Sequence, residues 1–92
     1  MESGRHAIWD KHNRKHLFVD HADRGITEAQ VTYVVENARD DNIAPDPKRG
    51  TTIALCRVGR RVLSVAWVVR SRGGCYPVHA HWAGRRERES LK

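Results

Sequence analysis

A stretch of ten residues that is apolar on both faces constrains the fold of this chain more than any other feature. It runs from Arg61 to Arg70, between the turn Gly59-Arg60 and the turn Ser71–Gly74. Because side chains alternate across a strand, one face carries Leu63, Val65, Trp67 and Val69, and the other carries Val62, Ala66 and Val68. Such a strand is typical of the centre of a sheet, with a layer on each side or with one face lining a site.

The segments around this strand predict the rest of a small sheet. Thr51–Val58 precedes it and Cys75–Trp82 follows it, and the two glycine turns join the three strands into a meander. His6–Asp10 predicts a short first strand. The run Arg39–Gly50 contains two prolines among acidic and amide residues, which is typical of a loop.

Two helices are predicted between the first strand and this loop. Asp10 is a favourable N-cap for a helix from Lys11 to about Asp23. Thr27 and Gln30 form the pattern of a capping box, which predicts a second helix that ends near Arg39. The apolar stripe Val31, Val34, Val35 and Ala38 indicates that the second helix packs against the sheet.

The order of elements is β-α-α-β-β-β-α, because the charged segment Ala83–Lys92 predicts a short C-terminal helix. This order predicts an α+β fold, with two N-terminal helices on one face of a small antiparallel sheet. A chain of 92 residues suffices for one domain, so we expect residues 1–92 to form a single unit.

The chain is strongly basic, and arginine supplies most of the charge. Lys and Arg number 17 against 11 acidic residues, for a net charge of +6, and 13 of the 17 are Arg. A guanidinium binds phosphate through two hydrogen bonds and stacks on bases, so this bias favours a nucleic acid or an acidic protein as partner. The alternative is a basic surface that only keeps the protein in solution.

Other features bear on the cellular setting. Cys56 and Cys75 lack the spacing of a zinc site and lie in or beside apolar strands, where a buried free thiol is typical. No apolar run approaches about 18 residues, and the N-terminus lacks the apolar core of a secretion signal. We therefore expect a cytoplasmic protein with no membrane segment and no cofactor.

The last predicted strand holds the candidate for chemistry. Alternation sends Tyr76, Val78, Ala80 and Trp82 toward the helices. His79 and His81 then face the open side of the sheet, about 7 Å apart. Arginines flank this side, with Arg57 and Arg61 near the hairpin end and Arg70 and Arg72 near the other. Cleavage of RNA through its 2′-hydroxyl needs a base and an acid, which two histidines supply, while arginine stabilises the charge of the pentavalent phosphorus.

These considerations assign His79, His81 and Arg70 as candidate catalytic residues. The candidates for RNA binding are Lys11, Arg14, Arg57, Arg61, Arg85 and Arg86. The C-terminal helix is either a solvated end or a cover over the open face that presents Arg85 or Arg86 to the substrate. The alternative for His79 and His81 is that they are ordinary polar residues on a solvated sheet face.

Two further interpretations of the same residue types carry less weight. A zinc site would combine the histidine pair with His12 and His16, but these lie on a different element and no general-base Glu accompanies them, so we predict no metal. The tryptophans Trp9, Trp67 and Trp82 favour a place in the core over base stacking.

Several short motifs, in this order, resemble the BrnT-type toxins of type II toxin–antitoxin systems, small members of the RelE/ParE-like superfamily. The motifs are Ile8-Trp9-Asp10, Gly25-Ile-Thr-Glu-Ala29, Pro45-Asp46-Pro47, Val58-Gly-Arg-Arg-Val62 and Ala80-His-Trp-Ala83-Gly-Arg-Arg86-Glu87-Arg88. The stretch His21-Ala-Asp-Arg-Gly-Ile-Thr27 is also similar to a related family of small domains of the same topology. The resemblance covers nearly the whole chain, and the order of the motifs carries it.

The resemblance implies a RelE-like fold and an endoribonuclease that acts with or without the ribosome. It also implies an acidic or DNA-binding antitoxin that forms a tight heteromeric complex with the toxin. The last strand departs from the family, because His79-Ala80-His81-Trp82 stands where Ser-Ala-Arg and a further basic residue are typical. The first helix also departs, with His12-Asn13 in place of Lys-Asn. These changes indicate either catalysis by histidine or an inactive copy.

Two non-catalytic functions stay open at this point. One is a binding module such as a ParE-like inhibitor of gyrase, and the other is a basic domain that binds nucleic acid without cleaving it.

Overall fold

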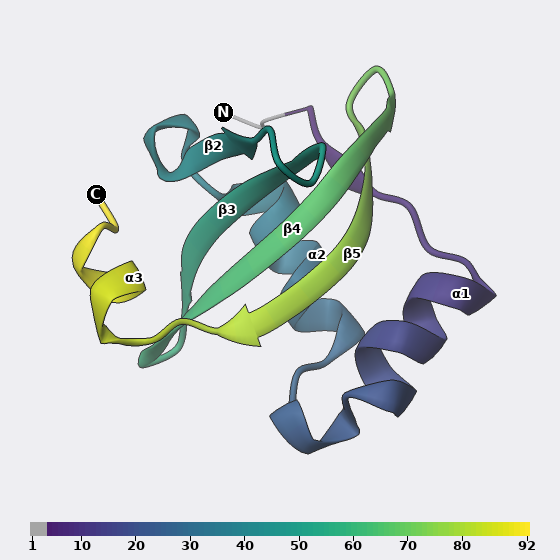
Figure 1. Cartoon of the computed structure of the whole chain (residues 1–92), viewed down its shortest axis with the longest axis horizontal. Helices are drawn as coiled ribbons and strands as arrows, with labels where there is room; N and C mark the ends of the chain where they lie inside the picture. The colour runs from purple at the N-terminus through teal and green to yellow at the C-terminus, as the bar shows by residue number, and fades with distance from the viewer. Residues whose placement is uncertain (1–3) are drawn as a thin grey trace.

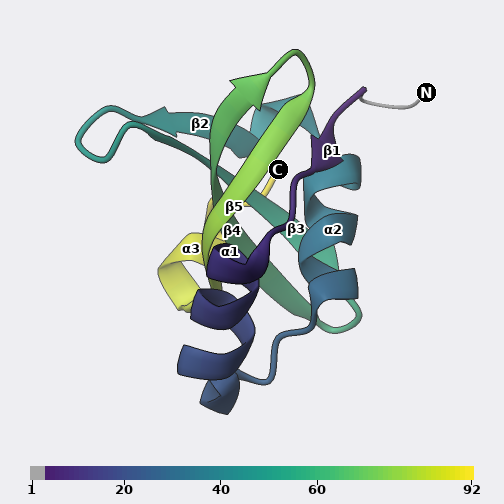
Figure 2. The same ribbon diagram turned by 90° about the vertical axis from the view of Figure 1, so that its right-hand side faces the viewer.

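A five-stranded sheet packs against a long helix on one face in the computed structural model, which describes residues 4–92, and a short C-terminal helix lies beside the sheet on the opposite side (Figures 1 and 2). In chain order the elements are β1 (His6–Ala7), α1 (Lys11–Arg14), η1 (Lys15–Asp20), η2 (Ala22–Arg24), α2 (Glu28–Asn37), η3 (Asp40–Asn42), β2 (Ile43–Asp46), β3 (Thr51–Val58), β4 (Arg61–Ser71), β5 (Gly74–Trp82) and α3 (Arg85–Glu89). The strand order across the sheet is β1-β5-β4-β3-β2. The fold is therefore α+β, and β4 lies at the centre of the sheet, as its sequence predicts.

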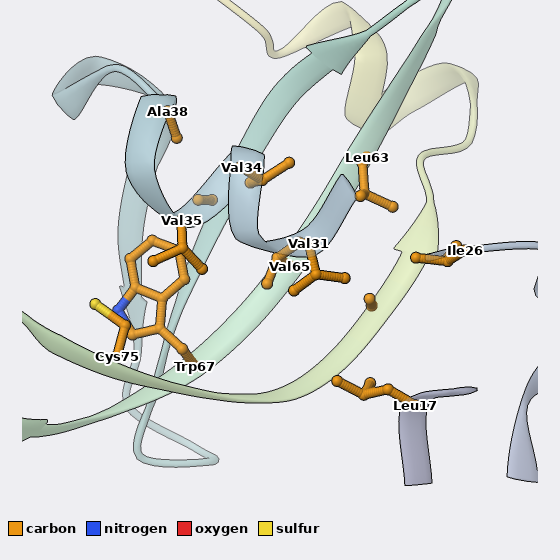
Figure 3. Packing of buried hydrophobic residues seen from close by; sticks show 12 residues of the cluster. Leu17, Ile26, Val31, Val34, Val35, Ala38, Leu63, Val65, Trp67 and Cys75 are labelled. Atoms are coloured by element: carbon orange, nitrogen blue, oxygen red, sulfur yellow. The ribbon is translucent and has the colours of Figure 1, made fainter. Parts of the chain in front are cut away.

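The core fills the space between α2 and the sheet. Thr27 caps α2 through the predicted capping box with Gln30, and Val31, Val34 and Val35 are fully buried. Figure 3 shows their side chains above β4, with Trp67 next to Val35. Burial of such aliphatic side chains stabilises a fold by roughly 1.5–3 kcal/mol each. The predicted apolar stripe of the second helix is confirmed.

The first helical segment is not one continuous α-helix. Asp10 caps α1 in a reciprocal box with Asn13, but the α-helical turns last only four residues before the π-helical η1 and the short 3₁₀ segment η2. Asn13 is buried and donates from Nδ2 to the carbonyls of Ile8 and Pro77. Gly25, with φ of +65°, ends the segment in a left-handed conformation that favours glycine. Asn13 therefore fastens the start of this segment to β5.

Two predictions about the sheet are wrong. The predicted loop Arg39–Gly50 contains β2, which pairs antiparallel with β3. β2 is an edge strand, where Pro45 is tolerated because no neighbour on its outer side needs a backbone N–H. The sheet is also not purely antiparallel, because β1 pairs in parallel with β5. These two strands are far apart in sequence, so no hairpin turn dictates their relative direction.

A bulge in β5 changes the predicted alternation of side chains. Pro77 lies opposite Trp67 and His79 lies opposite Ala66, so Val78 is an extra residue between two paired positions. Tyr76 therefore shares the face of Val68, opposite α2, where its hydroxyl donates to Asp10 at the start of α1, whereas the prediction placed it with the core residues. Ala80 is buried in the core and Trp82 packs against it, as predicted, because both follow the bulge.

The far end of β4 differs from the prediction as well. Val69 was assigned to the buried face, yet its side chain is 63% exposed. It lies on the wall of an open groove of about 400 Å³, between Trp67, Thr52 and Ile43. The groove lies where the helical layer leaves the sheet uncovered.

Candidate functional site

Three side chains form a continuous hydrogen-bonded chain on the sheet face opposite α2. Nε2 of His79 lies 3.1 Å from Nδ1 of His81, and Nε2 of His81 lies 3.0 Å from both carboxylate oxygens of Glu87. His79 and His81 are half-buried and follow the bulge of β5, while Glu87 comes from α3. The structure therefore brings together the two predicted histidines and adds a carboxylate.

Helix α3 owes its position to local contacts at both of its ends. Glu87 accepts a hydrogen bond from the backbone N–H of Gly84, which begins the helix. Beyond the helix, the backbone N–H of Lys92 donates to Asn42 Oδ1 at 2.7 Å. The C-terminal segment thus runs from the end of β5 to the start of β2, on the side of the sheet opposite α2 (Figure 2). The C-terminal helix combines features of both predicted placements. Arg85 pairs with Glu89 on a largely exposed helix, as expected of a solvated end, while Glu87, rather than Arg85 or Arg86, contacts the histidines.

The hydrogen-bond chain fixes the tautomers of both imidazoles. An ionised Glu87 only accepts hydrogen bonds, so Nε2 of His81 donates to it. Nδ1 of a neutral His81 is then an acceptor, and Nε2–H of His79 donates to it. This leaves Nδ1 of His79 as the free acceptor at the end of the chain. A proton taken up there can move along the chain until the positive charge lies beside Glu87.

The electrostatics of the chain favour a neutral His79 and an ionised Glu87. Burial lowers the pKa of His79, and the positive charges of His81 and Arg24 lower it further. Burial opposes ionisation of Glu87, but the Gly84 N–H and the His81 ring outweigh it and lower the pKa of that carboxyl. A neutral imidazole with a free nitrogen is the form that acts as a general base.

Arg24 is a fixed cation next to this chain that sequence reasoning missed. Its Nη1 donates to the carbonyl of Ala80 at 2.9 Å, and its own carbonyl accepts from Trp82 Nε1 at 2.8 Å. In the sequence, Arg24 precedes Gly25 and marks a helix break, with no local signal of a contact more than fifty residues away. Glu87 was missed for the same reason, because a charged tail helix gives no register relative to the sheet.

The predicted arginines of β3 and β4 are divided between the two faces of the sheet and do not form a ring around the histidines. Arg57 lies on the same face of the sheet, since it pairs with Val62, two positions from Ser64 opposite His81. Arg61 lies on the other face, with its guanidinium 3.8 Å from the Trp82 ring centroid. The assignment of Arg61 to the histidine face is therefore wrong, because alternation places it with Leu63.

Arg70 lies at the opposite end of β4 from the histidine pair. Its guanidinium stacks over Tyr76, 4.1 Å from the ring centroid. Ala66, the partner of His79, is four residues away along the strand, or about 13 Å at the usual rise per residue. The structure thus places the Arg70 guanidinium on Tyr76, and no hydrogen bond or ion pair joins it to His79 or His81 among residues 4–92.

The remaining candidates lie on the helices. Arg14 of α1 pairs with Glu28 at 2.7 Å, and Lys11 is exposed on the same helix. On α3, Arg85 pairs with Glu89 at 3.4 Å, while Arg86 is exposed beside Glu87. Arg85 and Arg86 thus border the histidine chain, and Lys11 and Arg14 form a separate basic surface.

Within residues 4–92, no three side chains of the metal-binding types come together at a metal-like site. His16 stacks edge-on against His21, with ring centroids 4.9 Å apart, rather than joining His12 or the histidine pair in a ligand set. The tryptophans take the predicted structural places, since Trp67 is buried and Trp9 and Trp82 pack against the core.

Both cysteines are free thiols, with Cys75 buried and Cys56 half-buried. Burial raises the pKa of each thiol, which disfavours the reactive thiolate. Neither cysteine is a candidate nucleophile.

Among the helices of residues 4–92, none has both the length and the apolar character needed to cross a membrane. Comparisons of the chain with protein-family models, with curated proteins and with solved structures find no match. The functional argument therefore depends on the site itself.

Proposed function

We propose that this chain is a metal-independent endoribonuclease in which His79 is the general base. The observation that supports this most is the chain of hydrogen bonds from His79 through His81 to Glu87. A net charge of +6 favours a polyanionic substrate that binds near this face. Because both ring nitrogens of His81 are hydrogen-bonded to His79 and Glu87, His81 relays a proton and does not contact the substrate.

The proposed reaction begins at the free nitrogen of His79. Nδ1 removes the proton of a ribose 2′-hydroxyl, and the 2′-oxygen attacks the adjacent phosphorus. His79 passes its Nε2 proton to His81, whose positive charge Glu87 stabilises. The bond from phosphorus to the 5′-oxygen breaks, Nδ1 of His79 gives its proton to that oxygen, and His81 returns the relayed proton to Nε2 of His79. The products are a 2′,3′-cyclic phosphate and a 5′-hydroxyl.

Purified protein tests this reaction directly. In EDTA, the wild type should cleave an all-ribose oligonucleotide to a 2′,3′-cyclic phosphate and leave the 2′-O-methyl analogue intact. His79→Gln should lower the rate by about 10²–10⁴-fold, the usual contribution of a general base. His6→Gln, an exposed histidine at the other end of the sheet, is the matched control and should cleave like the wild type. Cleavage that survives in His79→Gln contradicts the proposal.

We further propose that the enzyme is a RelE-like toxin of the BrnT type, neutralised by an acidic or DNA-binding antitoxin. The order of short motifs supports this, together with an α+β fold in which α2 packs against a small sheet. Expression in bacteria should arrest growth with loss of RNA, and co-expression of the product of an adjacent small gene should restore growth. Harmless expression of active enzyme would contradict the toxin while leaving the nuclease in place.

A non-catalytic binding module is the second candidate. The observation that favours it is that the His81–Glu87 pair also links α3 to β5. A purely structural role, in which the pair holds α3 in position, therefore accounts for this contact as well. As a ParE-like inhibitor or a basic nucleic-acid-binding domain, the chain would keep its effect on cells after His79→Gln. Signs of DNA damage, rather than RNA loss, would then accompany growth arrest.

A further inference from the structure

Within residues 4–92, no carboxylate neutralises the half-buried side chain of Arg24. Elsewhere in the chain, Arg5, Arg14, Arg39 and Arg85 each form an ion pair with a carboxylate. Among the residues that the structure describes, no carboxylate lies within ion-pair distance of Arg24. A partly desolvated charge without a counter-ion is unfavourable, so this position is suited to an anion from outside the chain.

Hydrogen bonds hold both the guanidinium and the backbone carbonyl of Arg24 in place. The Ala80 carbonyl fixes one guanidinium nitrogen at the outer edge of β5, and the Trp82 indole fixes the Arg24 backbone. β1 pairs with β5 only at Gly74 and Cys75, so no strand occupies this part of the edge. A guanidinium that uses one nitrogen for a carbonyl keeps its other N–H groups for a ligand. Its conformation is therefore fixed before any ligand binds.

Two histidines, His16 and His21, lie on the helical segment that ends at Arg24. His16 and His21, from η1 and the turn after it, stack against each other at 4.9 Å. Burial lowers the pKa of His79, and charges on Arg24, His16 and His21 lower it further. The geometry agrees, because η1, which carries His16, packs against β5, the strand that carries His79. Arg24 and the two histidines thus come from one helical segment that contacts β5 next to His79, through the Ala80 carbonyl and through η1.

We propose that Arg24, with His16 and His21, forms a phosphate-binding subsite next to His79, which holds the phosphodiester that is cleaved. Arg24 is the residue that contacts a non-bridging oxygen, and the two histidines add positive charge when protonated. The subsite places a phosphate on the outer edge of β5, within reach of the base. The identity of the ligand as RNA rests on the proposed function, whereas the affinity for phosphate does not.

Inorganic phosphate is the probe for this subsite. In nuclear magnetic resonance titrations at about pH 6, phosphate should shift the ring signals of His79, His16 and His21 in the full chain. Arg24→Gln should weaken phosphate binding about tenfold or more, as the loss of a charge-assisted hydrogen bond implies. Arg49→Gln, which removes an exposed arginine from the turn between β2 and β3, should bind as the wild type does. Equal affinity in Arg24→Gln and Arg49→Gln overturns the subsite.

A second variant tests the subsite independently, in case Arg24→Gln does not fold. His16→Gln/His21→Gln changes two residues that are not buried, and it should keep the wild-type amide spectrum while weakening phosphate binding. Unchanged binding in this double variant contradicts the inclusion of both histidines. If phosphate binds through Arg24 but RNA is never cleaved, the nuclease is wrong and the subsite stands. If RNA is cleaved and Arg24→Gln has a wild-type KM, the subsite is wrong and the nuclease stands.

Discussion

His81 lies between His79 and Glu87, with 3.1 Å from its Nδ1 to Nε2 of His79 and 3.0 Å from its Nε2 to the Glu87 carboxylate. A strand supplies the two imidazoles and a five-residue helix supplies the carboxylate. Because a carboxylate only accepts hydrogen bonds, this arrangement determines which nitrogen of each ring carries the proton. Several measurable consequences follow.

The tautomers of the two histidines should be those that the hydrogen bonds dictate. At neutral pH, ¹⁵N spectra of the imidazoles should show the proton on Nε2 in both His79 and His81. In Glu87→Gln the preference at His81 should weaken, because a neutral amide offers a donor as well as an acceptor. An Nδ1–H tautomer of His81 in the wild type would contradict the proton relay.

Stability should fall as the pH drops below about 6.5, in part because of His79. Its pKa is lowered in the folded state by burial and by the nearby positive charges. The unfolded chain therefore binds a proton on this residue at a higher pH than the folded chain does, and protonation favours unfolding. The contribution should be complete above the unfolded pKa and disappear once the pH lies below the folded one.

Urea unfolding at several pH values, with His79→Gln as the comparison, isolates this contribution. Between about pH 6.5 and pH 5, the unfolding free energy of the wild type should fall more steeply than that of the variant. The difference between the two slopes should be less than the one-proton limit of about 1.4 kcal/mol per pH unit, because the His79 ring is half-exposed. Parallel curves for the two proteins would show that His79 does not titrate abnormally.

Asp10 should contribute more to stability than a typical N-cap. Its carboxylate accepts from the backbone N–H of Asn13 and from the hydroxyl of Tyr76, and these bonds lower its pKa. Asp10→Ala should therefore destabilise the fold by more than the loss of an N-cap alone, because the hydrogen bond to Tyr76 is lost as well. The measurement is the unfolding free energy in urea, and Thr27→Ala, whose hydroxyl caps only α2, should cost about 1 kcal/mol.

Truncation of two apolar residues of β4 should lower the stability by very different amounts. Leu63 is fully buried against α2, and Leu63→Ala should cost about 2–5 kcal/mol. Val69 is largely exposed, and Val69→Ala should change stability by less than about 0.5 kcal/mol. Comparable losses for the two variants in urea unfolding would contradict the burial assigned to this strand.

The sequence predicts the framework well because its signals are local. The capping box of Thr27 and Gln30, the stripe of α2 and the bounds of β3 all follow from short-range patterns. The order of elements then gives the α+β class. The prediction that His79 and His81 share a face is likewise confirmed, since alternation holds on their side of the bulge.

The features that the sequence analysis predicted wrongly or missed depend on contacts between segments that are distant in sequence. β1 pairs with β5 across more than sixty residues, and β2 is a strand only because β3 offers it an edge. The bulge at Val78 appears in the register and not in the composition, so the side of Tyr76 was assigned wrongly. Glu87 and Arg24 reach the histidine pair through tertiary contacts that no spacing in the sequence reveals.

The most direct test of the proton relay compares two isosteric changes on the same helix. Glu87→Gln keeps the shape of the side chain but removes the charge that stabilises protonated His81, whereas Glu89→Gln removes a charge that pairs with Arg85. Single-turnover cleavage of an all-ribose oligonucleotide in EDTA gives the rate for each protein. The relay predicts that Glu89→Gln cleaves like the wild type and that Glu87→Gln is about tenfold to a hundredfold slower. Equal rates for the two variants would contradict a catalytic role for the His79–His81–Glu87 chain.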